Sequence, residues 1–181
     1  SNHIIGKSSK IKNVKNICTK VSRSNSRILI SGPSGSGKET CARFIHSLSN
    51  RMNHPFVVAA CASLSNQMVD QLLFGFNDSK NNKNTKSLFE QANNGTIYFN
   101  EICDLPNDTQ AKLINVIQDQ SFYKYGSNKK IKIDIRVIAG TSYDPIEAVK
   151  NGILREDLYY RLSVVPYLYH LLILELKILM F

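Results

Sequence analysis

The sequence predicts an α/β fold in which helices cover both faces of a parallel sheet. Two observations predict it. Short apolar runs typical of buried strands alternate with segments whose apolar residues recur at helical spacing. One such run leads through a Gly/Ser loop and a lysine into a helical pattern, in the stretch ILISGPSGSGKETCARFIHSL at residues 28–48. Strands that alternate with helices pair in parallel, because each helix returns the chain to the same end of the sheet.

Four segments are predicted to be strands because they are short, apolar and rich in β-branched or aromatic residues. They cover residues 27–31, 55–60, 95–102 and 133–141. The predicted helices cover residues 37–48, 66–74, 85–94, 106–119, 145–150 and 156–162. Pro106 suits the start of its helix, and Gly95 suits the end of the helix before it. The polar run at 77–84 has no apolar anchor, so we expect an exposed loop there.

The composition of the 181-residue chain, with 43% hydrophobic and 20% charged residues, is typical of a globular domain. The formal net charge of +9 suits a polyanionic partner, either a nucleotide or a nucleic acid, but it also fits lysines scattered over a solvated surface. The cysteines are far apart and form no CxxC pair, which argues against a metal site and a disulfide framework and favours the reducing cytoplasm. They are Cys18, Cys41, Cys61 and Cys103.

The two ends of the chain give separate expectations. No signal peptide precedes the domain, and the chain starts with Ser1 instead of Met, so we expect a piece of a longer protein. The last segment, YLYHLLILELKILMF at 167–181, is apolar but shorter than the roughly 18–20 residues that cross a bilayer, so no membrane partner is expected. This segment fits a terminal core helix, an interaction helix or a tail that no longer encodes its ancestral structure.

Gly32, Gly37 and Lys38 satisfy the phosphate-loop pattern G-x-x-x-x-G-K. Glycines let backbone N–H groups turn toward a phosphate without a Cβ in the way, and the following helix offers free N–H groups to the same anion. Lys38 would reach the β- and γ-phosphate oxygens. A simple Gly/Ser turn is the alternative, but the strand, the lysine and the helix together favour nucleotide binding.

A nucleotide hydrolase also needs an acidic pair at the end of a neighbouring strand, one acid for Mg²⁺ and one to polarise the attacking water. The segment TIYFNEI supplies Glu101 for the water but has Asn100 in the magnesium position. An amide can hydrogen-bond to a magnesium-bound water, but it lacks the negative charge that a hard cation prefers. Glu101 is therefore the candidate catalytic residue and Asn100 a weak, water-mediated metal contact. A surface acid at a strand end is the alternative for Glu101.

Several motifs follow one another in order between residue 4 and about residue 166: SGPSGSGKE, PFVVAACASL, LLFG, SLFEQANNGTIYFNEI, QAKLINVIQDQSFYKYGS, IDIRVIAGT and ILREDLYYRLSVVP. Together they resemble the central AAA+ domain of sigma-54-dependent transcription activators of the NtrC/NtrX response-regulator type. The resemblance implies a P-loop NTPase of the AAA+ type, a three-layer sandwich over residues 1–166 that binds ATP and Mg²⁺. In this family Glu commonly follows the loop lysine, so Glu39 agrees with the motif.

The resemblance assigns roles by position. Residues 32–38 match the Walker A cradle, Asn100 and Glu101 match the Walker B pair, and Thr141 and Ser142 match the sensor I position. The residues thereby expected to hold the nucleotide are Gly32, Pro33, Ser34, Gly35, Ser36, Gly37, Lys38, Glu39, Thr40, Asn100 and Ser142.

Arg155 and Arg161 match the arginine fingers that reach a neighbouring subunit's γ-phosphate. A guanidinium supplied in trans offsets the charge that develops during phosphoryl transfer, so both are candidate catalytic residues in a ring-like homo-oligomer or dimer. The alternative for these arginines is local pairing with Glu156 and Asp157, which stabilises a surface by less than about 1 kcal/mol.

The sequence departs from the family pattern at several positions. Asn100 replaces the Walker B aspartate, Ala60 replaces the asparagine that restrains the catalytic glutamate, and Ser142 replaces the sensor asparagine. The GAFTGA loop that contacts sigma-54 should follow LFG, where this chain has FNDSKNNKN. The apolar tail at 167–181 replaces the helical lid, as in a truncated or frame-shifted end. Since losing one well-placed electrostatic group costs on the order of 10²–10³ in rate, we expect hydrolysis to be weakened more than ATP binding.

Three functions compete at this point. The first is an ATP-binding AAA+ domain of a cytoplasmic NtrX-like response regulator, which acts on transcription through a DNA-binding domain outside this chain and has little contact with sigma-54. The second is a nucleotide-gated or purely structural oligomerisation module without turnover. The third is a domain that binds nucleic acid directly through its positive charge.

Overall fold

The four main strands form a single parallel sheet, as predicted. The computed structural model describes residues 9–62, 64–78, 83–84 and 86–163. The sheet has the strand order β1-β8-β5-β2. Its strands are β1 (Ile28–Ser31), β2 (Phe56–Ala59), β5 (Thr96–Phe99) and β8 (Arg136–Thr141). The apolar tail predicted at 167–181, and any lid that it replaces, lie outside the described residues.

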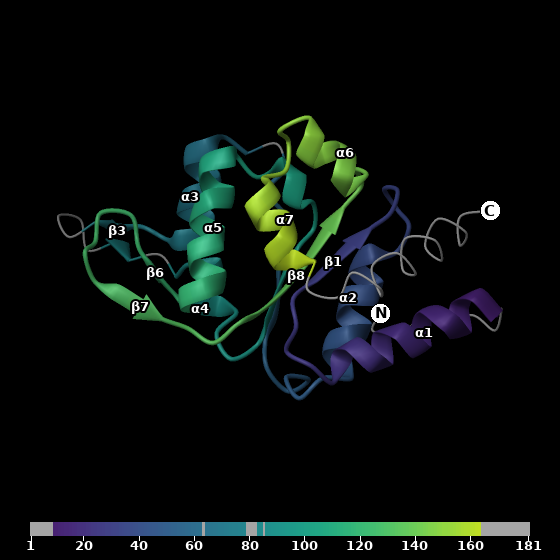
Figure 1. Cartoon of the computed structure of the whole chain (residues 1–181). Coiled ribbons are helices and arrows are strands. Elements are labelled where there is room, and N and C mark those ends of the chain that lie inside the picture. Colours follow the sequence, from purple (N-terminus) through teal and green to yellow (C-terminus); the bar gives the residue numbers. More distant parts are fainter. Residues whose placement is uncertain (1–8, 63, 79–82, 85, 164–181) are drawn as a thin grey trace.

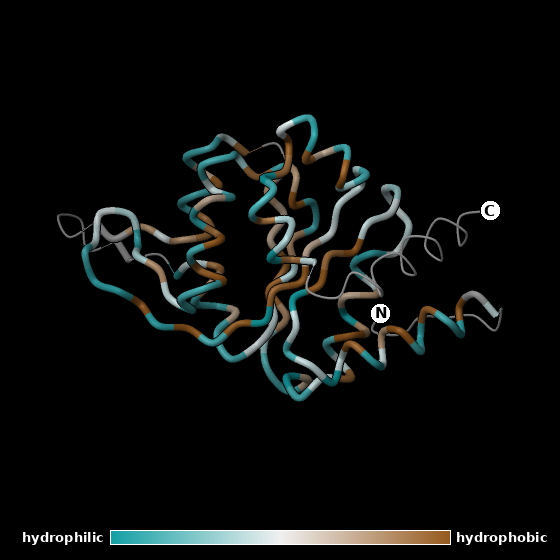
Figure 2. The backbone as a smooth tube through the Cα atoms, in the orientation of Figure 1, coloured by the Kyte–Doolittle hydropathy of each residue, from teal (hydrophilic) through white to brown (hydrophobic). Residues whose placement is uncertain are grey.

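Helices cover the sheet on both faces and complete a three-layer sandwich (Figure 1). One face is covered by α1 (Ser9–Ser22) and α2 (Lys38–Ser47). The other face is covered by α3 (Asn66–Phe74), α4 (Leu88–Gln91), α5 (Asn107–Asp119), α6 (Pro145–Lys150) and α7 (Glu156–Leu162). Figure 2 shows the hydrophobic residues gathered along the sheet and on the helix sides that face it.

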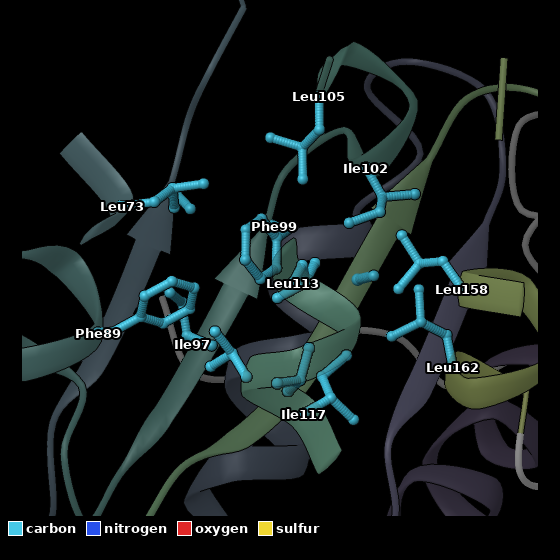
Figure 3. Packing of buried hydrophobic residues seen from close by; sticks show 14 of the residues in the cluster. Leu73, Phe89, Ile97, Phe99, Ile102, Leu105, Leu113, Ile117, Leu158 and Leu162 are labelled. Atoms are coloured by element: carbon cyan, nitrogen blue, oxygen red, sulfur yellow. The ribbon is translucent and has the colours of Figure 1, made fainter. Parts of the chain in front are cut away.

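Alternation along each strand divides the core into two clusters. In β5, Ile97 and Phe99 point to the α3–α7 side, whereas Tyr98 points to α1 and α2. Side chains alternate between the two faces of a sheet, so a strand buried on both faces is apolar throughout. Figure 3 shows the larger cluster, in which Phe99 and Leu113 meet at the centre and Leu158 closes the side.

The sheet register brings the carboxyl ends of the strands to one edge. Ser31 of β1 pairs with Thr141 of β8, and Phe99 of β5 pairs with Ala139 of the same strand. Residues that follow β1, β5 and β8 therefore meet at this edge, which is where ligands bind in open α/β sheets.

A buried guanidinium joins α1 to the sheet. Arg136, at the start of β8, is 1% exposed and donates to the carbonyl oxygens of Val21 (2.7 Å), Ser22 (3.3 Å) and Ser26 (3.2 Å). These acceptors follow or belong to the last turn of α1, whose carbonyls have no partner within the helix. The contact lets a charged side chain serve as a helix cap inside the core.

The prediction of a helix over 85–94 that ends at Gly95 was wrong in extent and in its stop. Only the single turn α4 forms, and it begins at a capping box in which Ser87 and Glu90 bond each other's backbone N–H groups. The left-handed residue after it is Asn94, with φ 65°. Gly95 is required for another reason, because a Cβ there would lie 2.0 Å from the carbonyl oxygen of Pro55.

The sequence reading also missed smaller elements. The run at 77–84, expected to be a loop, contains the short antiparallel strands β3 (Asn77–Asp78) and β4 (Lys83–Asn84). A second hairpin, β6 (Ser121–Tyr123) with β7 (Lys130–Lys132), and the helix α1 were not predicted.

Candidate functional site

The phosphate loop, residues 32–38, leaves β1 at the carboxyl edge of the sheet and leads into α2. Its start is held to β8, since the Gly32 N–H donates to the Thr141 carbonyl at 3.0 Å. Gly35 (φ 79°) and Gly37 (φ 85°) adopt left-handed conformations, and no neighbouring heavy atom lies within 4 Å of an added Cβ at either position. The loop therefore presents open backbone at the N-terminus of α2, where an anion is stabilised by free N–H groups and by the helix dipole.

Lys38 lies inside this loop. Its side chain is only 8% exposed, and Nζ donates to the carbonyls of Gly32 at 2.7 Å and Pro33 at 3.0 Å. Burial lowers the pKa of Lys38, while the charge of Glu101 acts in the opposite direction. The Ser36 hydroxyl is also buried, without a hydrogen-bond partner in the described part of the chain. A buried orphan donor and an ammonium in one loop fit a phosphate group.

The loop faces the ends of β5 and β8 across a cavity of about 470 Å³. The residues that line it are Ser34, Gly35, Gly37, Lys38, Glu39, Asn100, Glu101, Asp104, Ser142 and Tyr143. Most of the predicted site residues are thus brought together. Gly32 and Pro33 contribute indirectly, through the carbonyls that bind Lys38. Glu39 pairs with Arg43 one turn further along α2, at 2.8 Å.

Glu101 is held by hydrogen bonds from Ser142, which follows β8, and from the short helix η1 (Ile102–Asp104). Its Oε2 atom accepts from both the backbone N–H and the hydroxyl of Ser142, each at 2.6 Å. Its Oε1 atom accepts from the Cys103 N–H at 3.3 Å. The carboxylate is therefore oriented by groups that follow two adjacent strands.

The donor set of the cavity fits a magnesium ion. Asn100, Glu101 and Asp104 line one wall with an amide and two carboxylates, and Mg²⁺ prefers such oxygen ligands together with water and phosphate oxygens. Burial, followed by the charge of Glu101, raises the pKa of Asp104. A carboxyl group whose charge is disfavoured by a neighbouring carboxylate is in a suitable environment for a bound cation.

Arg155 and Arg161 do not line this cavity. Arg155 pairs with Asp157, with both guanidinium contacts at 3.0 Å, which is the local pairing considered as the alternative. Arg161 lies against α5, where the Gln118 side-chain oxygen, in the orientation that satisfies both groups, accepts from its two terminal nitrogens at 3.0 and 2.5 Å.

Sequence reasoning missed two residues of the cavity wall. Asp104 comes three residues after Glu101, and η1 turns it back toward the loop. Tyr143 follows Ser142 and is 45% exposed. A second acid three residues after Glu101 could have indicated Asp104 from the sequence. No sequence pattern indicated that Tyr143 lines the cavity.

Other features of the described residues lie apart from this site. A larger cavity of about 560 Å³ lies between α5 and the β6–β7 hairpin, but its wall includes no part of the phosphate loop. The four cysteines are buried free thiols. In the part of the chain that is described, no helix combines the length and apolarity needed to cross a membrane.

The open parallel sheet, the glycine loop with its buried lysine and the facing polar strand ends define a P-loop NTPase domain. Comparisons with known proteins agree. The family model for the sigma-54 interaction domain matches residues 4–167. The chain belongs to this family, and the resemblance drawn from its motifs is confirmed.

Among curated relatives, the nitrogen assimilation regulatory protein NtrX of Azorhizobium caulinodans is 40% identical over 163 residues, which are 90% of this chain and 36% of that protein. A putative NtrX-like response regulator of Rickettsia felis is 44% identical over 156 residues, which are 83% of this chain and 32% of that protein. The chain thus spans about a third of the length of these relatives.

Solved structures give the same result. NtrX from Brucella abortus in complex with ADP has a TM-score of 0.84 at 36% identity, covering 91% of this chain and 37% of that chain. The same protein in complex with ATP has a TM-score of 0.83 at 37% identity, and the match covers 90% of this chain and 36% of that chain. The P-loop NTPase domain of a sigma-54 activator from E. coli has a TM-score of 0.60 at 18% identity over 88% of this chain and 93% of that one, and supports the fold alone.

Proposed function

We propose that this chain is the ATP-binding AAA+ domain of a cytoplasmic NtrX-like response regulator that acts in transcription. One observation carries the proposal: the left-handed Gly35 and Gly37, the buried Lys38 and the polar pair Asn100 and Glu101 surround a single cavity at the carboxyl edge of the sheet. The complexes of the Brucella NtrX with ADP and ATP support a nucleotide as the ligand.

The chemistry of the site favours binding over rapid turnover. When bound, Mg²⁺ supplies positive charge beside the terminal phosphates; Asn100 and Asp104 would hold it, directly or through water. Lys38 and the loop amides orient the phosphates, and Glu101 orients water when its carboxylate is free. Asn100 lacks the charge that an aspartate would supply, so hydrolysis is slow.

The remaining parts of the proposal concern partners. Arg155 and Arg161 lie outside the cavity of their own chain, which suits a role in trans at the site of a second copy in a homo-oligomer. The segment FNDSKNNKN differs from the GAFTGA loop by which the family contacts sigma-54, so that contact is weak or lost. Binding to DNA then belongs to a separate domain of the full regulator.

ATP with Mg²⁺ is expected to raise the melting temperature of the chain. At a nucleotide concentration about 100 times Kd, binding stabilises by about 2.7 kcal/mol, which corresponds to a shift of about 5–10 °C for a domain of this size. The Lys38→Ala variant is expected to lose this shift, because it removes the only ammonium in the described cavity wall. Differential scanning fluorimetry with and without ATP–Mg²⁺ makes the measurement.

The matched control is Lys132→Ala, which removes an exposed lysine of β7 and should keep the full shift. A parent protein that shows no shift with any adenine nucleotide contradicts nucleotide binding. A Lys38→Ala variant that retains the full shift contradicts the assignment of the loop.

A second candidate function is a nucleotide-gated oligomerisation module without turnover. Two features favour it: Asn100 stands in the magnesium position, and the Glu101 carboxylate already accepts two hydrogen bonds from Ser142. In this case ATP–Mg²⁺ raises the molar mass measured by light scattering, while phosphate release stays at the background of the Glu101→Ala variant. Phosphate release clearly above that background excludes the module without turnover.

A further inference from the structure

The larger cavity, of about 560 Å³, lies among α3, α5 and the β6–β7 hairpin, which Figure 1 shows beside one another. Its volume falls in the range of roughly 300–1,000 Å³ that is usual for small-molecule sites. Its floor is apolar, because Phe74, Val116 and Phe122 line it and are buried. The cavity thus has the size and the floor of a ligand site, and the proposed nucleotide function does not use it.

Two exposed aromatic rings stand at the rim of this cavity. Tyr123 is 53% exposed and Tyr125 is 60% exposed, although both line the cavity. The Tyr125 ring stacks on Phe76 with the ring centroids 5.9 Å apart, and its backbone N–H donates to the Gly75 carbonyl at 3.1 Å. Tyr123 is held in β6, opposite Lys130 of β7. Rings that are fixed in position but remain exposed favour a flat, apolar occupant.

Two of the four charged groups in the wall are already satisfied within the fold. The ammonium group of Lys112 pairs with the Asp70 carboxylate, and it lies over the Phe74 ring, 5.9 Å from the ring centroid. Asp70 also accepts the hydroxyl of Thr109 at 2.6 Å. These two charges therefore do not call for a ligand.

The other two charged groups of the wall, Lys130 and Asp119, are unpaired. Among the described residues, neither side chain forms a hydrogen bond or an ion pair, and the two do not pair with each other. A wall with two cations and two anions is neutral and does not favour a ligand of net charge. One free cation and one free anion instead complement a ligand that carries both charges.

A buried hydroxyl adds a further polar group to the wall. Ser121 lines the cavity and is only 5% exposed, and its Oγ atom has no hydrogen-bond partner in the described part of the chain. A buried hydroxyl without a partner destabilises the fold, and a polar ligand group placed against it would remove that cost. The hydroxyl therefore favours a filled cavity over an empty one.

We propose that this cavity is a second ligand site, which takes a small aromatic zwitterion of the kind of a free aromatic amino acid. The ring of the ligand packs on Phe122 and against the rim tyrosines, its carboxylate meets Lys130, and its ammonium group meets Asp119. The site is independent of the proposed nucleotide function, since the two cavities share no wall residue.

The absence of tryptophan from the sequence gives a direct test. When fluorescence is excited where tyrosine does not absorb, the signal comes only from added L-tryptophan. A ligand of about 15 heavy atoms is expected to bind with a Kd of about 1 mM or lower, so the protein is titrated to that concentration. The fluorescence anisotropy of L-tryptophan should rise to saturation, and Tyr125→Ala should weaken binding about 2- to 10-fold. A parent protein that gives no rise overturns the inference.

Two analogues separate the charges, because tryptamine lacks the carboxylate and indolepropionate lacks the ammonium group. Lys130→Ala should weaken L-tryptophan and indolepropionate by up to about fivefold and leave tryptamine unchanged. Asp119→Asn should weaken L-tryptophan and tryptamine and leave indolepropionate unchanged. Both side chains are exposed, so neither substitution disturbs the core. The matched control is Lys129→Ala, which removes an exposed lysine outside the cavity wall and should leave all three ligands unchanged.

The remaining outcomes decide against the site. If Lys130→Ala and Asp119→Asn affect all three ligands equally, or affect none of them, the ligand lies elsewhere and the assignment is overturned. N-acetyltryptophanamide carries the same ring without either charge. If it binds as tightly as L-tryptophan, the cavity accepts an aromatic side chain of a protein partner, and the zwitterion is refuted.

Discussion

The Asn100→Asp variant is expected to release phosphate from ATP on the order of 10²–10³ times faster than the parent, which is the usual effect of one well-placed electrostatic group on a rate. Asn100 and Glu101 lie on the cavity wall opposite Lys38 and Gly37. An aspartate there adds the negative charge that a magnesium ion prefers and that an amide lacks. The Mg²⁺ concentration for half-maximal rate should fall in the same variant. Steady-state phosphate release over a Mg²⁺ titration measures both quantities.

The double variant Asn100→Asp/Glu101→Ala is the control for this gain. Glu101 is the acid that we propose orients water, so its removal should return phosphate release to the background. A gain that survives in the double variant would assign the water to another group, and Asp104 is the next carboxylate in the cavity wall. A parent that already hydrolyses ATP as fast as Asn100→Asp would contradict the weakened-hydrolysis proposal.

The Gly95→Ala variant is expected to lose about 2–4 kcal/mol of unfolding free energy, combining overpacking with one broken hydrogen bond. A Cβ at position 95 would lie 2.0 Å from the Pro55 carbonyl oxygen, and this oxygen accepts the Thr96 N–H at 2.8 Å. The neighbouring atoms are backbone, so no side chain can rotate away. Urea denaturation followed by circular dichroism gives the difference.

Gly152→Ala is the matched control, because its added methyl group meets no atom within 4 Å and only the left-handed φ of 70° opposes it. Its expected cost is about 1–2 kcal/mol, from the conformation of an L-residue alone. A Gly95→Ala variant that is as stable as the parent would show that β2 and β5 can separate at this point.

Periodicity predicted the larger elements well. The helices over 145–150 and 156–162 match α6 and α7 at both ends, and 66–74 matches α3. The helix α1 was missed although Val14, Ile17, Cys18 and Val21 follow helical spacing and are buried. The exposed residues Lys12, Asn16 and Lys20 lie between them, and they hid the pattern.

Hairpin formation was harder to predict. The strands β6 and β7 have three residues each, which is too short for a periodic pattern to stand out, and they form a separate two-stranded sheet outside the main one. The helix α4 has only four residues, too few for a periodic pattern, and it is stabilised by the Ser87–Glu90 capping box. Such elements are fixed by local hydrogen bonds that periodicity does not record.

The phosphate loop was predictable because its function needs a fixed spacing of Gly32, Gly37 and Lys38 along the chain. The hydrogen bonds of Glu101 were not predictable, because their donor Ser142 lies 41 residues further along the sequence. That contact requires the register of two parallel strands and a glycine at position 140. Its geometry is a property of the folded sheet.

The strand order β1-β8-β5-β2 separates β1, which leads into the phosphate loop, from β5, which leads into the proposed general base Glu101. The strands β1 and β5 do not pair with each other, and β8 lies between them and pairs with both. A sub-ångström displacement of β8 along its axis would therefore alter the loop, through the Gly32–Thr141 bond, and the base, through Ser142, in a single movement. A substitution that shifts β8 would therefore change the loop and Glu101 together without replacing a residue of the cavity wall.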